Sequence, residues 1–274
     1  MPELPEVETT RRGIEHSLTG RLVTGLLLRE RRLRWPVPEG VCTALPGRHV
    51  LGVRRRAKYL LVDLDGGTLL LHLGMSGSLR VLPSDTPPLA HDHYDLQLDS
   101  GRCLRFNDPR RFGSLHWLAG DEDPAAHPLL ARLGPEPLGR EFEAAHLFEH
   151  SRGRRVAVKP FLMDQHVVVG VGNIYASEAL FRAGIHPRTQ AGRIGLGRYG
   201  RLVEAVRAVL EEAIREGGTT LRDYVSAEGT PGYFRQKLFV YERTGEPCRT
   251  CGRPIRHLVL GQRSTYYCPR CQRR

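Results

Sequence analysis

Hydrophobic residues at helical spacing predict three helices. Near the N-terminus, apolar positions between residues 7 and 18 fall on one face, which predicts a helix that fixes the start of the chain in place. Two more helices are predicted at 174–183 and 202–214, each followed by glycine. The segment 168–173, just before the first of these two, is rich in glycine. Backbone N–H groups at such a helix start can bind a phosphodiester, although a plain turn explains the same residues.

A different pattern, typical of short strands, fills much of the first half of the chain. Residues 50–64 and 68–73 predict two strands joined by an Asp-Gly-Gly turn, and residues 94–106 predict a hairpin that turns at Ser-Gly. Polar and apolar residues alternate clearly from 95 to 99, as in a strand with one buried face. Strands of this length and spacing indicate a β-sandwich or a β-barrel.

The two patterns are separated by a segment with the composition of a linker. Residues 121–140 contain four prolines and an acidic run. We therefore place a β-rich domain at 1–120 and a helical region at 141–235, followed by a tail at 236–274.

Composition indicates a globular protein that binds a polyanion. The chain has 274 residues, of which 40% are hydrophobic, and a formal net charge of +11. Such a charge favours a polyanionic partner, although it does not say which one. No apolar run approaches the ~18 residues of a membrane span, and no signal-peptide pattern opens the chain. We expect a cytosolic or nucleoid protein that does not bind membranes.

Four of the six cysteines lie in the tail at spacings that predict a zinc site. Cys248 and Cys251 form one Cys-x2-Cys pair, and Cys268 and Cys271 form another. Four thiolates leave zinc no open position for water, so we predict one structural Zn²⁺ ion. Residues 235–274 hold ten basic and two acidic residues, which favours nucleic acid over protein as the partner of this module. The other two cysteines, Cys42 and Cys103, are expected as small buried residues in a reducing compartment.

Several loops between the predicted strands carry residues unusual for simple connections. Lys58 follows an arginine run, Met75 lies between two glycines, and Arg110, Arg111 and Phe112 lie on a turn bounded by proline and glycine. Exposed apolar side chains beside basic groups suit entry into a base stack with binding of phosphates. In the ordinary alternative the apolar side chains are packed inward and the arginines are merely solvated.

The N-terminus offers a nucleophile. A small residue at position 2 allows removal of Met1, which leaves Pro2 with a free secondary amine. An α-amino group titrates near ~8, so a useful fraction is unprotonated at neutral pH and can attack a carbonyl carbon. Glu3 and Glu6 supply carboxylates within reach of it. In the ordinary alternative the start is solvated, and the proline and the acids only favour the beginning of a helix.

Motifs along the whole chain resemble those of bacterial formamidopyrimidine-DNA glycosylase, the repair enzyme for 8-oxoguanine. They are PELPEVE at 2–8, RAKY at 56–59, HLGMSG at 72–77, DPRRFG at 108–113, KP at 159–160, GVGNIYASE at 170–178 and the four-cysteine tail. The resemblance implies an α+β fold with two domains, one on each side of a groove that binds DNA. In it, an N-terminal β-sandwich domain with a helix is followed by a helical helix-two-turns-helix domain, which ends in a zinc-finger β-hairpin.

The resemblance also implies roles for four catalytic residues. Pro2 would attack C1′ of the damaged nucleotide and expel the base, and Glu3 would be the acid/base for sugar protons. Lys58 would serve β-elimination and Arg263 δ-elimination. We thus expect a bifunctional glycosylase and abasic-site lyase that excises oxidised purines from double-stranded DNA, as a monomer in the bacterial cytoplasm.

Further residues are candidates for contact with the DNA. We assign these contacts to Glu6, His72, Met75, His91, Arg110, Arg111, Phe112, Arg154, Lys159 and Asn173. In the family resembled, residues such as Met75, Arg110 and Phe112 fill the gap that a flipped base leaves, and Lys159 and Asn173 match groups at the phosphates. The loop 219–233 resembles a cap over the flipped base.

Three alternatives remain from the sequence. An endonuclease VIII-like glycosylase would prefer oxidised pyrimidines, but its start differs from that of this chain. A non-catalytic DNA-binding protein of the same fold would lack Pro2, Glu3 or Lys58, and all three are present. A zinc-ribbon RNA-binding or scaffold protein would not need a free N-terminal amine.

Overall fold

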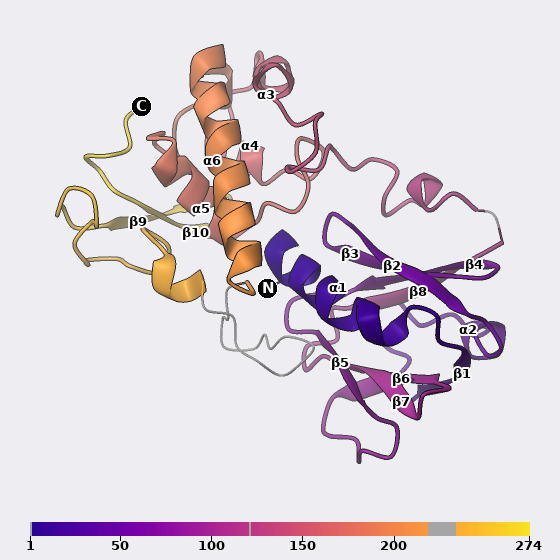
Figure 1. The fold of residues 1–274 in the computed structure, drawn as a ribbon. Helices are drawn as coiled ribbons and strands as arrows, with labels where there is room; N and C mark the ends of the chain where they lie inside the picture. The colour runs from indigo at the N-terminus through magenta and orange to yellow at the C-terminus, as the bar shows by residue number, and fades with distance from the viewer. Residues whose placement is uncertain (1, 121, 219–233) are drawn as a thin grey trace. The chain divides into compact units, whose positions relative to one another are not determined.

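The computed structural model describes residues 2–120, 122–218 and 234–274, which form two compact units (Figure 1). The first unit comprises Met1–Ala131 and Glu216–Arg235, and the second comprises Arg132–Arg215 and Gln236–Arg274.

The first unit begins with helix α1 (Leu4–Leu18), which confirms the helix predicted near the N-terminus. It begins earlier than predicted because Glu3 and Glu6 form a capping box at its first turn. Val7, Ile14 and Leu18 are buried in the core of the unit. The core therefore fixes the position of the N-terminus.

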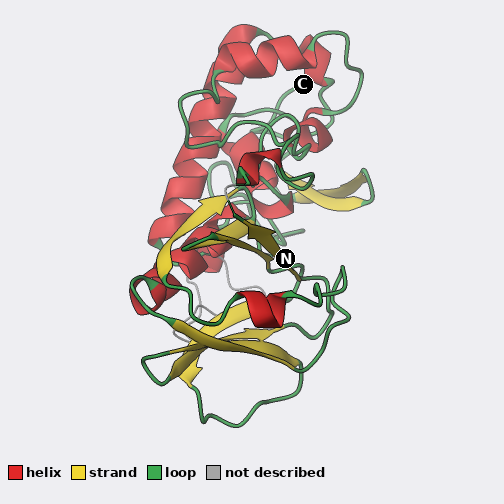
Figure 2. Cartoon of the chain, turned by 90° about the vertical axis from the view of Figure 1, so that its right-hand side faces the viewer, coloured by secondary structure: helices red, strands yellow, loops and turns green. Residues whose placement is uncertain are grey.

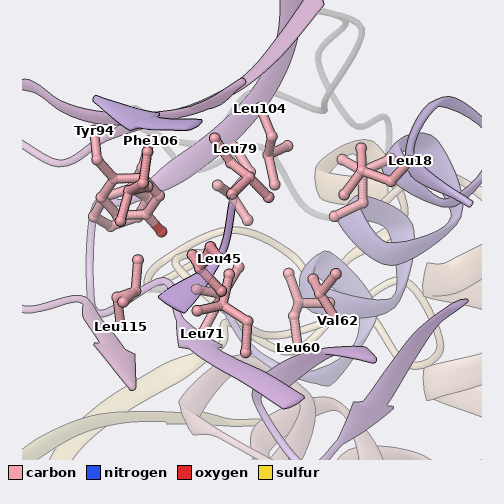
Figure 3. Packing of buried hydrophobic residues seen from close by; sticks show 14 of the residues in the cluster. Leu18, Leu45, Leu60, Val62, Leu71, Leu79, Tyr94, Leu104, Phe106 and Leu115 are labelled. Atoms are coloured by element: carbon pink, nitrogen blue, oxygen red, sulfur yellow. The ribbon is translucent and has the colours of Figure 1, made fainter. Parts of the chain in front are cut away.

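Two four-stranded antiparallel sheets follow. Their orders are β2-β3-β4-β8 and β1-β6-β7-β5. The bounds are β1 (Val23–Leu28), β2 (Val50–Arg56), β3 (Tyr59–Leu64), β4 (Gly67–His72), β5 (Ser78–Pro83), β6 (Asp92–Leu98), β7 (Arg102–Asn107) and β8 (Ser114–Ala119), with a short helix α2 (Val41–Ala44) after β1. Side chains of both sheets and of α1 pack into one core, in which Tyr94 and Phe106 stack (Figure 3). The sheets thus form a β-sandwich.

One strand prediction was wrong. Residues 50–64 form two strands, because the chain turns at Ala57, whose φ is +54°, and Lys58. The hairpin at 94–106 is confirmed as β6 and β7.

Two connections cross from one sheet to the other at the same end of the sandwich. His72 at the end of β4 pairs with Ser114 at the start of β8, and Ser78 at the start of β5 pairs with Asn107 at the end of β7. The crossing segments 73–77 and 108–113 therefore leave the sheets side by side.

The second unit is mainly helical, as Figure 2 shows. Its helices are α3 (Ala144–Ser151), α4 (Val158–Leu162), α5 (Asn173–Arg182) and α6 (Leu196–Arg215), and its hairpin is β9 (Arg256–Leu260) with β10 (Arg263–Tyr267). Short 3-10 turns lie at Pro124–Ala126 in the first unit, at Ala191–Arg193 in the second, and at Phe234–Lys237, where the chain passes from the first unit to the second. Both predicted helices are confirmed as α5 and α6, and α6 packs against α3 and α5. Among the described residues, no helix combines the length and the apolar character needed to cross a membrane.

Candidate functional site

The first described residues of the chain are buried. Pro2 is buried, and Glu3 and Glu6 are each 2% exposed. The Glu3 backbone N–H donates to Glu6 Oε2 over 2.8 Å. Gly218 lies against Glu6, since a β-carbon added there would be 3.1 Å from Glu6 Oε1. The alternative hypothesis of a solvated N-terminus is therefore wrong. Its second part, that the acidic residues favour the beginning of a helix, is confirmed by the capping box.

Lys58 lies in the turn after β2, the strand that packs against α1. Arg55 of β2 donates to Glu8 of α1 over 3.2 Å, and Arg11, one turn further along α1, donates to the Val53 carbonyl over 3.2 Å. The helix and the strand therefore run antiparallel, and continuing β2 to its end leads toward the first residues of α1. The turn that carries Lys58 follows there.

His72, at the end of β4, lies beside this turn. It pairs with Tyr59, and their rings are 4.8 Å apart. Burial, and then the positive charges of Lys58 and Arg34, lower the pKa of His72 to about 4. Its Nδ1 accepts the Gly74 N–H over 3.0 Å, so the proton of the neutral ring is on Nε2. At neutral pH His72 is thus an uncharged group next to a lysine.

The two crossing segments present the candidate wedge residues. Phe112 is 41% exposed and Arg110 is also exposed, with its guanidinium carbon 4.8 Å from the Phe112 ring centroid. The inward packing considered for Phe112 is therefore wrong, whereas Met75 is partly buried. Arg111 is exposed and contacts Glu30 Oε2 over 3.3 Å.

His91 precedes β6 at the same end of the sandwich. Its side chain is exposed and its φ is +71°. The segment 219–233, expected to cap a flipped base, lies outside the described residues. The residues that flank it meet, because the Phe234 N–H donates to the Gly218 carbonyl over 3.2 Å.

In the second unit, Lys159 is a buried support. Its ammonium is enclosed, with the side chain 1% exposed, and donates to Asn173 Oδ1 over 2.6 Å. It also donates to the Ser264 carbonyl and to Thr265 Oγ1, each over 2.9 Å. These contacts connect the first residue of α5 with strand β10. Arg263, the first residue of β10, is exposed after a two-residue turn.

Arg154 is the remaining predicted DNA contact of this unit. Its guanidinium is 5.5 Å from the centroid of the Phe161 ring and 3.7 Å from an oxygen of Asp164. The side chain is 43% exposed, so the ion pair is weak and leaves the cation accessible to solvent.

The four tail cysteines converge as the zinc prediction requires. Their Sγ atoms all lie within 4.8 Å of one another, with 3.9 Å between Cys248 and Cys271 and 3.5 Å between Cys251 and Cys268. A tetrahedral Zn²⁺ with Zn–S bonds of ~2.3 Å has S···S edges of about 3.8 Å, so the donors fit this ion. The cysteines pack with Phe181 of α5, which joins the zinc module to the helices.

Glu178, the last residue of the GVGNIYASE motif, is a supporting residue whose role the sequence does not predict. It is fully buried in α5, and its carboxylate accepts the backbone N–H groups of Phe239, Val240 and Tyr241, each over 2.9 Å. Burial raises its pKa. The sequence signal that could have indicated this role is a glutamate among the apolar residues of a predicted helix.

Comparisons with known proteins agree along the whole chain. Residues 1–115 match the family model of the formamidopyrimidine-DNA glycosylase N-terminal domain, residues 133–225 match that of its H2TH domain, and residues 245–274 match that of the zinc finger found in FPG and IleRS. A curated relative, the formamidopyrimidine-DNA glycosylase of Thioalkalivibrio sulfidiphilus, is 63% identical over 275 residues, with both chains fully covered.

Two solved structures are similar over nearly their full length. The MutM (FPG) protein of Thermus thermophilus is 41% identical with a TM-score of 0.87, covering 99% of this chain and 98% of that one. A Lactococcus lactis FPG variant in complex with Fapy-dG-containing DNA is 33% identical with a TM-score of 0.91, and both chains are fully covered.

Proposed function

Because this chain belongs to the formamidopyrimidine-DNA glycosylase family, a family of base-excision-repair enzymes that act on damaged DNA, we propose that it excises oxidised purines through a Schiff base on Pro2 and then cleaves the strand. The observation that carries the proposal is the buried, capped start of α1. Pro2 and Glu3 directly precede this helix, and the turn with Lys58 follows strand β2, which packs against it.

The first step is displacement of the damaged base. The unprotonated Pro2 nitrogen forms a bond to C1′, the glycosidic bond breaks, and the base leaves with its electron pair and takes up a proton. Glu3 is the proton carrier at the sugar, which opens so that nitrogen and C1′ form an iminium. A secondary amine can form this cation directly, and no metal is required for it.

Strand cleavage follows from the acidity that the iminium creates. It withdraws electrons from the C2′–H bond, so a base can remove this proton and expel the 3′ phosphate. Lys58 serves this β-elimination, and Arg263 serves the subsequent δ-elimination of the 5′ phosphate. The neutral His72 beside Lys58 adds no competing positive charge there.

The exposed loops of the sandwich are proposed to hold the opened duplex. Extruding a nucleotide costs a few kcal/mol, and Met75, Arg110 and Phe112 fill the gap that remains. Arg110 stacked on Phe112 presents guanidinium donors to the unpaired base opposite the lesion. The residues proposed to contact the sugar-phosphate backbone are His91, Arg111, Arg154 and Asn173. Glu6 and His72 are proposed to line the site of the extruded nucleotide.

The second unit contributes the zinc module and two positioned groups. The zinc ion held by the four cysteines is structural: it stabilises the hairpin that carries Arg263. Lys159 is buried, so we assign it to holding Asn173 and the hairpin near the phosphates rather than to a phosphate itself. The helical part (141–235) and the zinc finger (236–274) are proposed as the DNA-binding modules beside the catalytic domain (1–120). We propose a monomer that works at the nucleoid in the bacterial cytoplasm.

Borohydride trapping tests the proposal. Incubation with a duplex containing 8-oxoguanine opposite cytosine should give a covalent adduct on the N-terminal peptide, because reduction of the iminium makes the bond permanent. The chain has only three lysines, Lys58, Lys159 and Lys237, so few other amines compete. Glu3→Gln should abolish turnover while DNA affinity stays within about threefold, since the isostere removes proton transfer but not phosphate contacts.

The controls separate this function from its alternatives. Pro2→Gly replaces the secondary amine of the N-terminus by a primary amine. A protein that retains Met1 has the nitrogen of residue 2 in a peptide bond, so this nitrogen is no longer a nucleophile. An adduct that maps to Lys58, or full activity with a blocked N-terminus, would contradict the assignment. Faster excision of an oxidised pyrimidine than of 8-oxoguanine would favour an endonuclease VIII-like specificity.

A further inference from the structure

Asp108 is a fully buried carboxylate at the base of the wedge loops. It follows strand β7, its exposed fraction is 0%, and the proposed function gives it no role. A carboxylate is costly to remove from water, so its oxygens need hydrogen-bond donors. The donors come from both segments that cross between the sheets.

One oxygen of Asp108 joins the two crossing segments. Its Oδ1 accepts the Ser76 hydroxyl over 2.7 Å, and Ser76 directly follows Met75 in the other segment. The same oxygen accepts the Arg110 backbone N–H over 3.2 Å. One atom thus fixes the residues that place both Met75 and Arg110.

The other oxygen closes the loop that carries Phe112. Asp108 Oδ2 accepts the backbone N–H of Gly113 over 2.8 Å. Together with the Arg110 contact, this bond holds the backbone on both sides of the exposed Arg110–Phe112 pair. The side-chain stack between them is therefore presented by a loop bound at both ends.

The backbone of Asp108 extends these contacts to a third segment. Its N–H donates to the His91 carbonyl over 3.0 Å, and its own carbonyl accepts the ring N–H of His93 Nε2 over 2.7 Å. His91, whose left-handed backbone places an exposed ring at this end of the sandwich, is thereby held as well. Three segments distant in sequence meet at one residue.

We propose that Asp108 is a positioning residue that holds Met75, Arg110, Phe112 and His91 as one rigid element, so that they enter the duplex together when the damaged nucleotide is extruded. This inference rests on the proposed function and deepens it. A preorganised element avoids the entropic cost of ordering each side chain on the DNA. An asparagine has the same shape but only one acceptor oxygen. Its N–H₂ group would therefore face one of the donors that Asp108 binds, and that donor would lose its hydrogen bond.

Two variants test the inference on two substrates. Asp108→Asn should lower the single-turnover excision of 8-oxoguanine by about tenfold or more, because a buried donor loses its acceptor. Borohydride trapping on DNA with a preformed abasic site should fall by less than about threefold, since no stacked base has to be extruded. Ser76→Ala, which only removes a hydroxyl, should act in the same direction more weakly. A 2-aminopurine placed beside the lesion reports the unstacking itself.

Asp63→Asn is the matched control. Asp63 lies in the same unit and accepts the Thr68 hydroxyl over 3.0 Å, but it is on β3 away from the crossing segments. The Asp63→Asn protein should excise 8-oxoguanine and be trapped on abasic-site DNA at rates near those of the wild type.

An Asp108→Asn protein that loses both activities equally, or neither, would overturn the inference. If that variant fails to fold, an unchanged 8-oxoguanine rate in Ser76→Ala would do so. Failure of the wild-type protein to form any adduct would instead refute the proposed function.

Discussion

Replacing Gly74 by alanine should displace the loop that carries Phe112 without removing any functional group. Gly74 follows β4 with a φ of +68°. A β-carbon added there would lie 2.4 Å from the backbone carbonyl carbon of Phe112 and 2.5 Å from the backbone nitrogen of Gly113. Backbone atoms cannot rotate aside as a side chain does, so the two crossing segments must move apart.

The magnitude has two parts. An alanine in the left-handed region costs about 1–2 kcal/mol, and overpacking against a fixed neighbour costs about 1–3 kcal/mol. Gly74→Ala should therefore destabilise the first unit by about 2–5 kcal/mol. Gly101→Ala isolates the first part, because Gly101 has a φ of +72° and nothing lies within 4 Å of its added β-carbon.

Calorimetry of both variants measures the difference. For a unit of this size, the extra 1–3 kcal/mol corresponds to a melting temperature lower by about 3–10 °C in Gly74→Ala than in Gly101→Ala. Excision of 8-oxoguanine should fall with Gly74→Ala and stay near wild type with Gly101→Ala. Equal melting temperatures and equal rates would refute the close packing of the two segments.

Four other outcomes are expected. Cys248→Ser should lose zinc and DNA affinity together, because the thiolates hold the hairpin, and unchanged affinity in zinc-free protein measured by anisotropy would contradict this. Arg110→Ala should abolish a preference of about tenfold or more for cytosine over adenine opposite the lesion, because its donors match the cytosine acceptors but oppose the adenine amino group. Arg111→Ala should instead weaken all pairs about equally, and excision rates opposite the four bases decide between these outcomes. The pKa of His72 is lowered from 6.5 to about 4 in the folded protein, so the unfolded chain binds a proton first as the pH decreases. The free energy of unfolding should therefore fall by about 3 kcal/mol between pH 6.5 and pH 4. A His72→Gln protein with the same pH dependence of unfolding would argue against this reasoning.

Features set by local sequence were predictable. Helix α1, the hairpin of β6 and β7, and the zinc site each depend on residues close in the chain, namely a capping pair, a Ser-Gly turn and two Cys-x2-Cys pairs. The predicted order of a β-rich part before a helical part likewise follows from the change in hydrophobic period.

Features set by distant residues were not predictable. The turn at Ala57 and Lys58 contains neither glycine nor proline, and its left-handed Ala57 is stabilised by the fold rather than by local preference. The alternating pattern around Asp95 is that of a strand with a solvated face, yet Asp95 is 2% exposed because Arg105 and Arg29 bind it. In the same way, nothing adjacent in sequence shows that Lys159 is buried.

The scarcity of lysine has a chemical consequence if the protein opens a sugar to an aldehyde, as proposed. Only three of the 41 basic residues are lysines, and one of these, Lys159, is buried. An arginine guanidinium remains protonated at any physiological pH and does not condense with aldehydes as an amine does. A surface charged by arginine can therefore attract DNA strongly while remaining inert toward an opened abasic sugar, and the damaged strand is not cross-linked to the wrong part of the protein that repairs it.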